Sequence, residues 1–571
     1  MSRFLGSESQ KAALRAPPAS EIGTRMPHPI QRTPRPIRRD TDAERDPPAD
    51  NGSGASLGTM PESESRTAKT TSMARAVPPT TAVIPISPAA RWRAFWVCVS
   101  VAAITILDMT KVNVALPSIG EVLGASSTQL QLIVSGFVLT FGLVLVPMGR
   151  LGDQRSRRTL FIVGLSLYTV TSVMCALAPT ATVLLVGRLL QGVAAGIQMP
   201  QVLGMAQELF QGRERARAFG LFGATIGVAT AFGPTLGGLL IALGGPTDGW
   251  RLIFWMNVPL CLAAIGLALW LLPDTRTRSH RRVQLDPVGV LLFGASVVSL
   301  MWPFLFTTGA PTDNPARWWL LVAFALFVSA FIAWERHYAA RGRKPLIPLK
   351  LFRIGSYRNG TLLQTAYFTA APAMFLVTTL FLQIGLGLEP VYAGMVSIGF
   401  ALASAVTSWV GGNLVSSHGR VVVVWGLVAM LACVGGLMLT ALYAPPEWTP
   451  YIMAAIMTVG GAGGGLVIAP NQTLTLAEIP VKQGGVAGSV GQLGQRIGAA
   501  VGTAVALSLF YAAIYRESGS HDNLVVYHDA YAFGMVSVGL FLALAFIVSI
   551  VDLTARRRVG SRSSATDSPV P

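Results

Sequence analysis

The sequence predicts an all-α integral membrane protein with about fourteen transmembrane helices. Of its 571 residues, 52% are hydrophobic and only 12% are charged, against about 25% charged residues in soluble domains. After residue 90, each apolar run is long enough to cross a bilayer, which takes about 20 residues. The polar breaks between the runs are short, so no soluble domain fits after residue 90.

Each apolar run is expected to form one helix that crosses the membrane. The runs are centred near Ala103, Val138, Leu167, Val193, Ala229, Leu262, Ala295, Phe327, Phe375, Ala401, Met430, Met457, Ala500 and Leu540. Residues 1–90 are polar and rich in Pro, Ser and Arg, which predicts a disordered tail rather than a further helix.

Lysines and arginines indicate the orientation of these runs. They gather in every second break, whereas the alternate breaks are nearly free of them. The basic clusters are Arg91 and Arg93, then Arg155, Arg157 and Arg158, then Arg213, Arg215 and Arg217, then Arg276, Arg278, Arg281 and Arg282, then Arg341, Arg343, Lys344, Lys350 and Arg353, then Arg420, then Lys482, and finally Arg556, Arg557 and Arg558. By the positive-inside rule both termini are cytoplasmic, which requires an even number of spans.

Composition also excludes several classes of function. The net charge of +17 does not indicate a nucleic-acid-binding protein, because the basic residues lie between apolar runs rather than on one soluble face. Cys98, Cys175, Cys261 and Cys433 lie inside apolar runs, with no disulfide or metal spacing. No Walker A pattern, metal-binding cluster or nucleophile elbow is present, so neither an enzyme nor a nucleotide-driven pump is expected.

A nine-residue segment occurs twice and divides the chain into related halves. Gly149–Arg157 recurs as Gly412–Arg420, with the first glycine, the leucine and the last arginine in register. In the second copy, Ser416 replaces Asp153. Repeated halves around two extra runs are typical of transporters whose site lies between the halves.

This repeat predicts a six-plus-two-plus-six organisation. The predicted parts are a disordered cytoplasmic tail over 1–90, an N-terminal six-helix bundle over 91–273, two linker helices with their loops over 274–356, a C-terminal six-helix bundle over 357–553 and a cytoplasmic tail over 554–571.

Asp108 is the only carboxylate that we place well inside an apolar run. Such charges are costly in hydrocarbon and usually functional. A rise of about 1.5 Å per residue puts Asp108 of run 1 and Arg188 of run 4 at similar depth, so we expect both to face one aqueous cavity. Burial favours the neutral acid and a nearby cation favours the carboxylate, so a change in the cavity can drive proton uptake. The alternative is a permanent ion pair that holds the bundle together.

Lys111 lies one helical turn beyond Asp108 and can meet it on one helix face. Two interpretations are open: Lys111 modifies proton binding at Asp108, or its side chain extends to the outer interface. In either case one acid accompanies two bases, because Arg188 is also near. This balance disfavours a dication and favours a neutral, anionic or singly charged lipophilic substrate.

Glutamines follow one face of run 4. Gln191 and Gln198 nearly eclipse at about 100° per residue, with Gln201 beside them. They form either a cavity wall that offers hydrogen bonds to substrate or contacts between helices. We expect Asn113 of run 1 and Arg496 of run 13 to line the cavity as well, Arg496 from the second half.

Six segments together resemble the major facilitator superfamily, specifically its fourteen-span drug:proton antiporter branch. In chain order they are Leu107–Pro117, Gly149–Arg158, Arg188–Gly192, Gly233–Gly238, Gly249–Pro259 and Trp334–Leu346. Each segment is modest alone, but their order and spacing are specific. The resemblance covers nearly all of the chain after residue 90.

The resemblance implies the major facilitator fold and roles for two segments. In the first, Gly149, Asp153, Arg157 and Arg158 are implied to form a conformational latch at the cytoplasmic face that stabilises one access state. In the second, a kinked and closely packed helix limits leak in antiporters. The residues that match this antiporter motif are Gly233, Pro234, Gly237 and Gly238.

Three residues depart from the family pattern. Ser156 and Ala229 stand where glycine is usual, and Lys111 replaces an apolar residue. In addition, we find no membrane-embedded acid in the second half, a feature of some relatives that export dicationic drugs. This also disfavours dicationic substrates here.

The implied function is proton-driven export of small lipophilic compounds such as drugs or antibiotics across the cell membrane. Asp108, Arg188 and Lys111 would form the proton-coupling site. The expected partners are the substrate, protons and membrane lipids, and the expected state is a monomer without cofactor or metal. Two alternatives stay open: a dedicated exporter of a cell-envelope lipid, siderophore or secondary metabolite, and a proton symporter for nutrient uptake, against which the antiporter motif argues.

Overall fold

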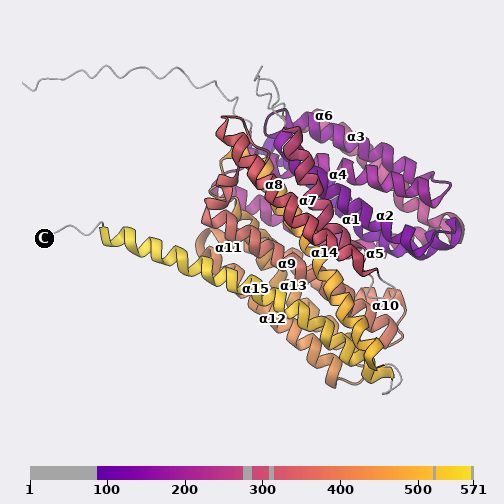
Figure 1. Ribbon diagram of the computed structural model, residues 1–571. Coiled ribbons are helices and arrows are strands. Elements are labelled where there is room, and N and C mark those ends of the chain that lie inside the picture. Colours follow the sequence, from indigo (N-terminus) through magenta and orange to yellow (C-terminus); the bar gives the residue numbers. More distant parts are fainter. Residues whose placement is uncertain (1–86, 274–285, 308–313, 518–522, 567–571) are drawn as a thin grey trace, which may run out of the picture. The chain divides into compact units, whose positions relative to one another are not determined.

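The computed structural model describes residues 87–273, 286–307, 314–517 and 523–566. All of these belong to one compact unit, Val83–Pro571. The predicted tail over 1–90 falls almost entirely outside the described residues. Regular secondary structure in the described ranges is helical throughout (Figure 1).

Within these ranges, fourteen helices are long and apolar enough to cross a membrane. Each predicted centre, from Ala103 to Leu540, falls in a different one of these spans. The predicted fold class and number of spans are therefore confirmed. The predicted orientation of the termini stays a prediction.

The first six spans are formed by α1 to α6. Their bounds are α1 Pro88–Leu123, α2 Ser127–Gly152, α3 Arg157–Ala176, α4 Ala181–Leu209, α5 Gly212–Trp255 and α6 Asn257–Leu271. α5 reaches into the sixth span, because a φ of 78° at Gly245 separates the span Gly212–Gly245 from the span Thr247–Leu271.

The remaining eight spans include several short turns. The linker region contains α7 Pro287–Leu305, η1 Pro315–Trp319, α8 Leu320–Ala340 and η2 Leu349–Arg353. The last six spans contain α9 Gly355–Leu380 with the π turn η3 Phe381–Gly385, α10 Pro390–Met395 with α11 Ile398–His418, α12 Arg420–Tyr443, α13 Thr449–Thr475, η4 Val481–Gln483 with α14 Gly484–Glu517, and α15 Asn523–Thr566.

Serine caps determine where two helices of the first group begin. Ser126 starts α2 with a capping box, in which its hydroxyl accepts from the Gln129 amide and the Gln129 side chain accepts from the Ser126 amide. Ser156 starts α3 by accepting from the amide of Thr159 at 3.3 Å. The serine that departs from the family pattern therefore satisfies an amide that has no partner within the helix.

Glycines let the helices within each group approach closely. A Cβ at Gly192 of α4 would collide with Thr140 and with the Phe137 carbonyl of α2. In the second group, Gly426 of α12 and Gly463 of α13 meet in the same way. Because lipid removes the hydrophobic drive for helix association, such close contacts supply much of the attraction.

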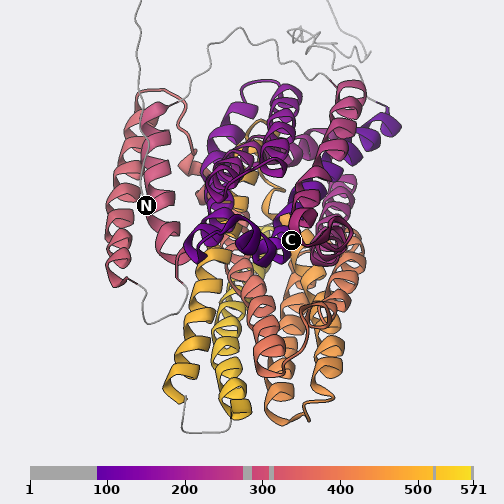
Figure 2. The ribbon, with the colours of Figure 1, turned by 90° about the vertical axis from the view of Figure 1, so that its right-hand side faces the viewer.

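The two six-helix groups meet along two seams. α2 packs on α14 at one seam, and α5 packs on α11 at the other. α7 lies across the first seam, where a Cβ at Gly142 of α2 would touch both Leu493 of α14 and Met301 of α7. Gln131 of α2 also donates to the Leu305 carbonyl at 2.8 Å. α8 runs alongside α7 (Figure 2). Few of its residues are buried.

Candidate functional site

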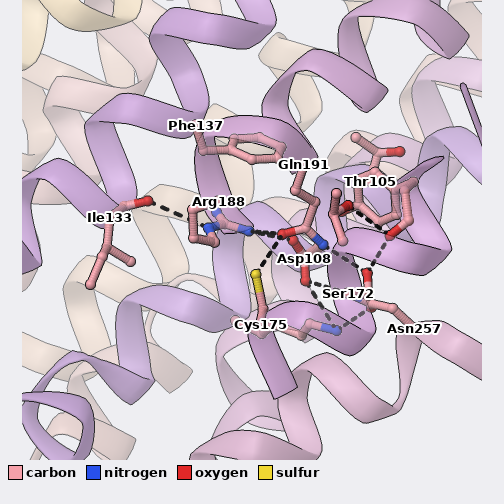
Figure 3. Close-up of polar contacts among 12 residues, drawn as sticks. Thr105, Asp108, Ile133, Phe137, Ser172, Cys175, Arg188, Gln191 and Asn257 are labelled. Atoms are coloured by element: carbon pink, nitrogen blue, oxygen red, sulfur yellow. Dashed lines mark hydrogen bonds and ion pairs between the residues drawn. The ribbon is translucent and has the colours of Figure 1, made fainter. Parts of the chain in front are cut away.

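Asp108 and Arg188 form a buried ion pair inside the first six-helix group (Figure 3). Arg188 Nη1 donates to Asp108 Oδ2 at 2.7 Å, and neither side chain is more than 1% exposed. Arg188 also donates to Gln191 Oε1 at 2.7 Å and lies 4.2 Å from the centroid of the Phe137 ring. The structure thus joins the two charges that the sequence places at similar depth. Both side chains are buried in this conformation, and the expected shared aqueous cavity stays a prediction.

Lys111 points into the same cluster rather than toward the outer interface. Its Nζ lies 3.5 Å from Asp108 Oδ1 and donates to Asn257 Oδ1 at 2.6 Å, and its side chain is fully buried. Asn257 in turn donates to Asp108 Oδ1 at 2.7 Å. The interpretation in which Lys111 extends to the interface is therefore wrong, because two acceptors hold its ammonium group inside.

Asn257 is the member of this cluster that sequence reasoning missed. It lies in the Gly249–Pro259 segment and opens α6, but nothing in that segment indicates which helix it faces. Its amide offers a carbonyl to Lys111 and an N–H group to Asp108. Through these two hydrogen bonds, Asn257 links Asp108 and Lys111 of α1 to α6.

The cluster encloses one carboxylate with two cations, a formal charge of +1 for Asp108, Lys111 and Arg188. Buried charges are tolerated only when they are paired and hydrogen-bonded. Here Asp108 accepts from Arg188 and from Asn257, with Lys111 close by. Because the three charges are coupled, protonation of one changes the balance of the others. Such an arrangement can link a proton to a change in helix packing.

Two glycines of the antiporter motif press α5 against α1 beside this cluster. A Cβ at Gly233 would collide with the Thr110 hydroxyl, and one at Gly237 would lie 2.9 Å from the Lys111 carbonyl oxygen. Any larger residue would push α5 away from the turn of α1 that carries Lys111. The motif therefore contributes to the enclosure of the ion cluster.

The other two motif residues do not interrupt α5. Gly238 has no neighbouring side chain or foreign backbone atom within 4 Å of a Cβ position. Helical torsions continue through Pro234, and the break in α5 falls at Gly245, where φ is 78°. The kink implied at Gly233–Pro234 stays a prediction, because a proline inside a helix removes one backbone hydrogen bond even where the torsions are helical. Glycine adopts a positive φ without steric cost, which makes Gly245 the easier place for a break.

Gln191, Gln198 and Gln201 are all buried and bond to other parts of the protein. Gln191 donates to Ser172 of α3 and Gln198 to Thr105 of α1, each at 2.9 Å. Gln201 donates to a backbone carbonyl of α2 at 3.1 Å. In this conformation the glutamines connect helices, as the second interpretation of the polar face holds.

Asp153 joins the two groups at the predicted cytoplasmic end of the α2–α14 seam. Its carboxylate accepts from the amides of Gly485 and Val486 at 2.9 and 3.0 Å, and it pairs with Arg157 at 2.7 Å. Arg157 also donates to the Val481 carbonyl at 3.3 Å. Burial raises the pKa of Asp153 above its ordinary value, and Arg157 and the two amides oppose this effect.

The other two residues of the predicted latch take different places. A Cβ at Gly149 would collide with Ser489 and with the Gly485 carbonyl, so this glycine lets α2 and α14 meet. Arg158 instead donates to the Leu269 carbonyl on α6 and does not reach the seam. Switching between access states by these residues stays a prediction.

Arg420 begins α12 as Arg157 begins α3, and it too pairs with a buried carboxylate. Its Nε lies 2.7 Å from Asp552 Oδ2 of α15, whose side chain is 4% exposed. Asp552 lies three residues before the end of the last candidate span, Val525–Ala555, so the expectation that the second half holds no membrane-embedded acid stays a prediction. Glu335 is also buried, near the end of its span, and its carboxylate accepts from the amides of Leu346 and Ile347 beyond that span.

Arg496 of α14 lies at the α2–α14 seam, 4.8 Å from the centroid of the Phe141 ring. It is half-buried, and its Nε has no hydrogen-bond partner. Gln492, one turn earlier, has a buried Oε1 that also lacks a partner. Asn113, expected at the same cavity, is exposed on α1.

Comparison with known proteins supports the resemblance seen in the motifs. The Major Facilitator Superfamily model matches residues 98–503. The chain is 33% identical over 436 residues to a probable actinorhodin transporter of Streptomyces coelicolor, covering 76% of this chain and 75% of the relative. It is 31% identical over 508 residues to puromycin resistance protein pur8 of Streptomyces alboniger, covering 86% and 97%. It is also 31% identical to multidrug resistance protein Stp of Mycobacterium tuberculosis, covering 70% and 72%.

Solved structures show the same fold at low sequence identity. The human organic anion transporter MFSD10 superposes with a TM-score of 0.58 at 15% identity, covering 80% of this chain and 99% of that chain. The proton:xylose symporter XylE gives 0.54 at 16% identity, with 80% and 95% covered. These likenesses concern the fold alone, and they confirm the predicted major facilitator fold. Together with the sequence relatives, they establish that this multi-pass membrane protein is a transporter, not an enzyme, and belongs to the major facilitator superfamily.

Proposed function

We propose that the protein is a proton-driven exporter of small lipophilic compounds such as drugs or antibiotics, with Asp108 as its proton site. The observation that carries the proposal is the complete burial of Asp108 between Arg188 and Lys111 within membrane spans. A carboxylate held in this way binds or releases a proton when its charged neighbours move. The names of the relatives, which concern antibiotic transport and drug resistance, support the substrate class.

The contacts at the α2–α14 seam suggest where this conformation lies in the cycle. Asp153 holds the seam at the predicted cytoplasmic end, which corresponds to a state closed toward the cytoplasm. From this state, Asp108 takes up a proton from outside and loses its charge, which weakens its hold on Arg188 and Lys111. The two groups then rock, the proton leaves toward the cytoplasm, and substrate binds from that side.

Transport in inverted membrane vesicles tests this proposal. A panel of fluorescent lipophilic compounds is followed with and without an imposed pH gradient, for native protein and for Asp108→Asn. We expect gradient-driven accumulation by the native protein and none by the variant, because an amide cannot carry the proton. Asp108→Glu keeps a carboxyl group and should retain part of the transport. Gradient-driven transport by Asp108→Asn would show that the proton binds elsewhere.

A second candidate is a dedicated exporter of one secondary metabolite, cell-envelope lipid or siderophore. It is favoured by the relative that is named as a probable actinorhodin transporter. The same compound panel separates the two, since a dedicated exporter moves one chemical class only. Transport of the substrate in the direction opposite to protons would exclude a symporter. In either case we propose a monomer in the cell membrane that uses the proton gradient, without cofactor, metal or nucleic acid.

A further inference from the structure

Arg496 is a cation without a counter-charge at the junction of the two six-helix groups. No carboxylate forms an ion pair with it among the described residues, and its Nε has no hydrogen-bond partner. The aromatic ring of Phe141, 4.8 Å away, is its charge-stabilising neighbour. An ionised side chain within a membrane span is costly, and such residues are typically retained for function.

The depth of Arg496 separates it from the membrane surface. Arg496 is twelve residues beyond Gly484, where α14 begins, which corresponds to about 18 Å of helix. On the other side of the seam, Phe141 of α2 is also twelve residues from its end of the seam, which is marked by Asp153. Since the hydrocarbon core is about 30 Å thick, Arg496 is too deep to meet a lipid headgroup at the surface.

The buried acids near the seam already have partners within the protein. Asp108 is held by Arg188 and Lys111, and Asp552 is paired with Arg420. Asp286 and Glu335 accept hydrogen bonds from backbone amides. None of these contacts includes Arg496. The charge of Arg496 is therefore left for a group that the protein itself does not supply.

We propose that Arg496 is the counter-ion for an anionic lipophilic substrate, an organic carboxylate or phenolate bound between the two groups. This inference rests on the proposed export function and specifies the chemical class of its substrate. The Arg496 guanidinium can bind a carboxylate through two parallel hydrogen bonds, which a lysine cannot do. Gln492 has an unpartnered carbonyl one turn away and accepts from a hydroxyl group of the same substrate.

Phe141 contributes to this site by holding Arg496 in place. An arginine beside an aromatic face is stabilised by the ring while its N–H donors remain free to bind an anion. Phe141 is itself fully buried, so the ring position is set by the packing of α2. The guanidinium is thus oriented before the substrate arrives, which lowers the entropic cost of binding.

Equilibrium binding to the purified full-length protein in lipid nanodiscs tests the inference. The probes are 1-pyrenebutyrate and its uncharged methyl ester, followed by quenching of tryptophan fluorescence at neutral pH. We expect the native protein to bind the carboxylate at least about tenfold more tightly than the ester, as hydrogen bonds to a charged group allow. Arg496→Gln should remove this preference by weakening binding of the carboxylate, and detectable binding of the ester shows that the variant is folded.

A second variant covers the case in which Arg496→Gln does not fold. Arg496→Lys keeps the charge but loses the paired donors, and it should show a reduced preference for the carboxylate. Equal affinity of the native protein for both probes, or an unchanged preference in the variants, would overturn the inference. Binding needs no pH gradient, so Asp108→Asn should keep the preference even though it abolishes proton-driven transport. The anion site and the proton coupling can therefore fail independently.

Discussion

Phe137 and Phe141 lie one turn apart on α2 with their ring centroids separated by 6.0 Å, and each ring contacts an arginine from another helix. Arg188 of the buried ion cluster lies over Phe137, and Arg496 of the second group lies over Phe141. Movement of α14 relative to α2 would separate Arg496 from its ring and leave Arg188 in place. The two rings therefore connect the proposed proton site with the proposed anion site across the seam.

Replacement of Phe141 should weaken the recognition of anions. In Phe141→Leu the guanidinium of Arg496 loses its aromatic neighbour, so we expect the preference for pyrenebutyrate over its ester to fall a few-fold, as a cation–π contact allows. Fluorescence binding measures this change. Phe137→Leu is the matched control on the same helix and should leave the preference intact. Equal effects of the two replacements would argue against a specific role for Phe141.

Removal of the Lys111 charge should shift the pH dependence of transport. Lys111 Nζ lies 3.5 Å from Asp108, so its loss in Lys111→Gln makes proton binding by the carboxylate easier. We expect the pH of half-maximal transport to rise by about one unit, equivalent to about 1.4 kcal/mol. The pH profile of vesicle transport measures the shift. Lys111→Arg keeps the charge and should keep the native profile, and a downward shift in Lys111→Gln would contradict the prediction.

The raised pKa of Asp153 predicts that closure of the α2–α14 seam depends on pH. When the seam is closed, burial makes Asp153 bind a proton more readily than a water-exposed aspartate does. Asp153 therefore stabilises the closed seam most at a pH below the ordinary aspartate pKa of about 3.9. This stabilisation is lost as the pH rises through the raised pKa of Asp153. The closed fraction should therefore fall as the pH rises above the ordinary pKa of about 3.9 and through the raised pKa of Asp153.

Spin labels on either side of the seam measure this closed fraction. Arg155 and Lys482 are both exposed, so cysteines introduced there can be labelled once the four buried native cysteines are replaced. Pulsed electron resonance then gives the population with the short distance at each pH. The measurement is made in the Asp108→Asn variant, so that protonation of the proposed proton site does not contribute to the change in distance. Asp153→Asn should abolish the dependence, and a closed fraction that rises with pH would refute the argument.

The transmembrane spans and the pairing of Asp108 with Arg188 were accessible from sequence, because both rest on local rules. A run of about 20 apolar residues crosses a bilayer whatever its neighbours are. A constant rise per residue also assigns a depth to every charge within a run. Similar depth in runs 1 and 4 was enough to suggest the ion pair that the structure contains.

The same rules say nothing about which faces of the helices meet. They did not predict the complete burial of Asp108 in this conformation, and they left two directions open for Lys111. They did not connect Asn257 with the cluster, since a polar residue at a helix start has no preferred partner in sequence. Asp552 falls within the predicted bundle over 357–553, but its pairing with Arg420 of another helix is not indicated by the sequence.

The amino-acid sequence by itself determined the fold class, the number of spans and the family of this protein. Those properties follow from hydrophobic length and from motifs, both of which are written along the chain. Only the tertiary structure decided that Lys111 turns inward, that Asn257 bridges two charges and that Arg496 has no ion-pairing acid among the described residues. The physical reason is that the environment of a buried charge depends on rotation and contact between helices that are distant in sequence.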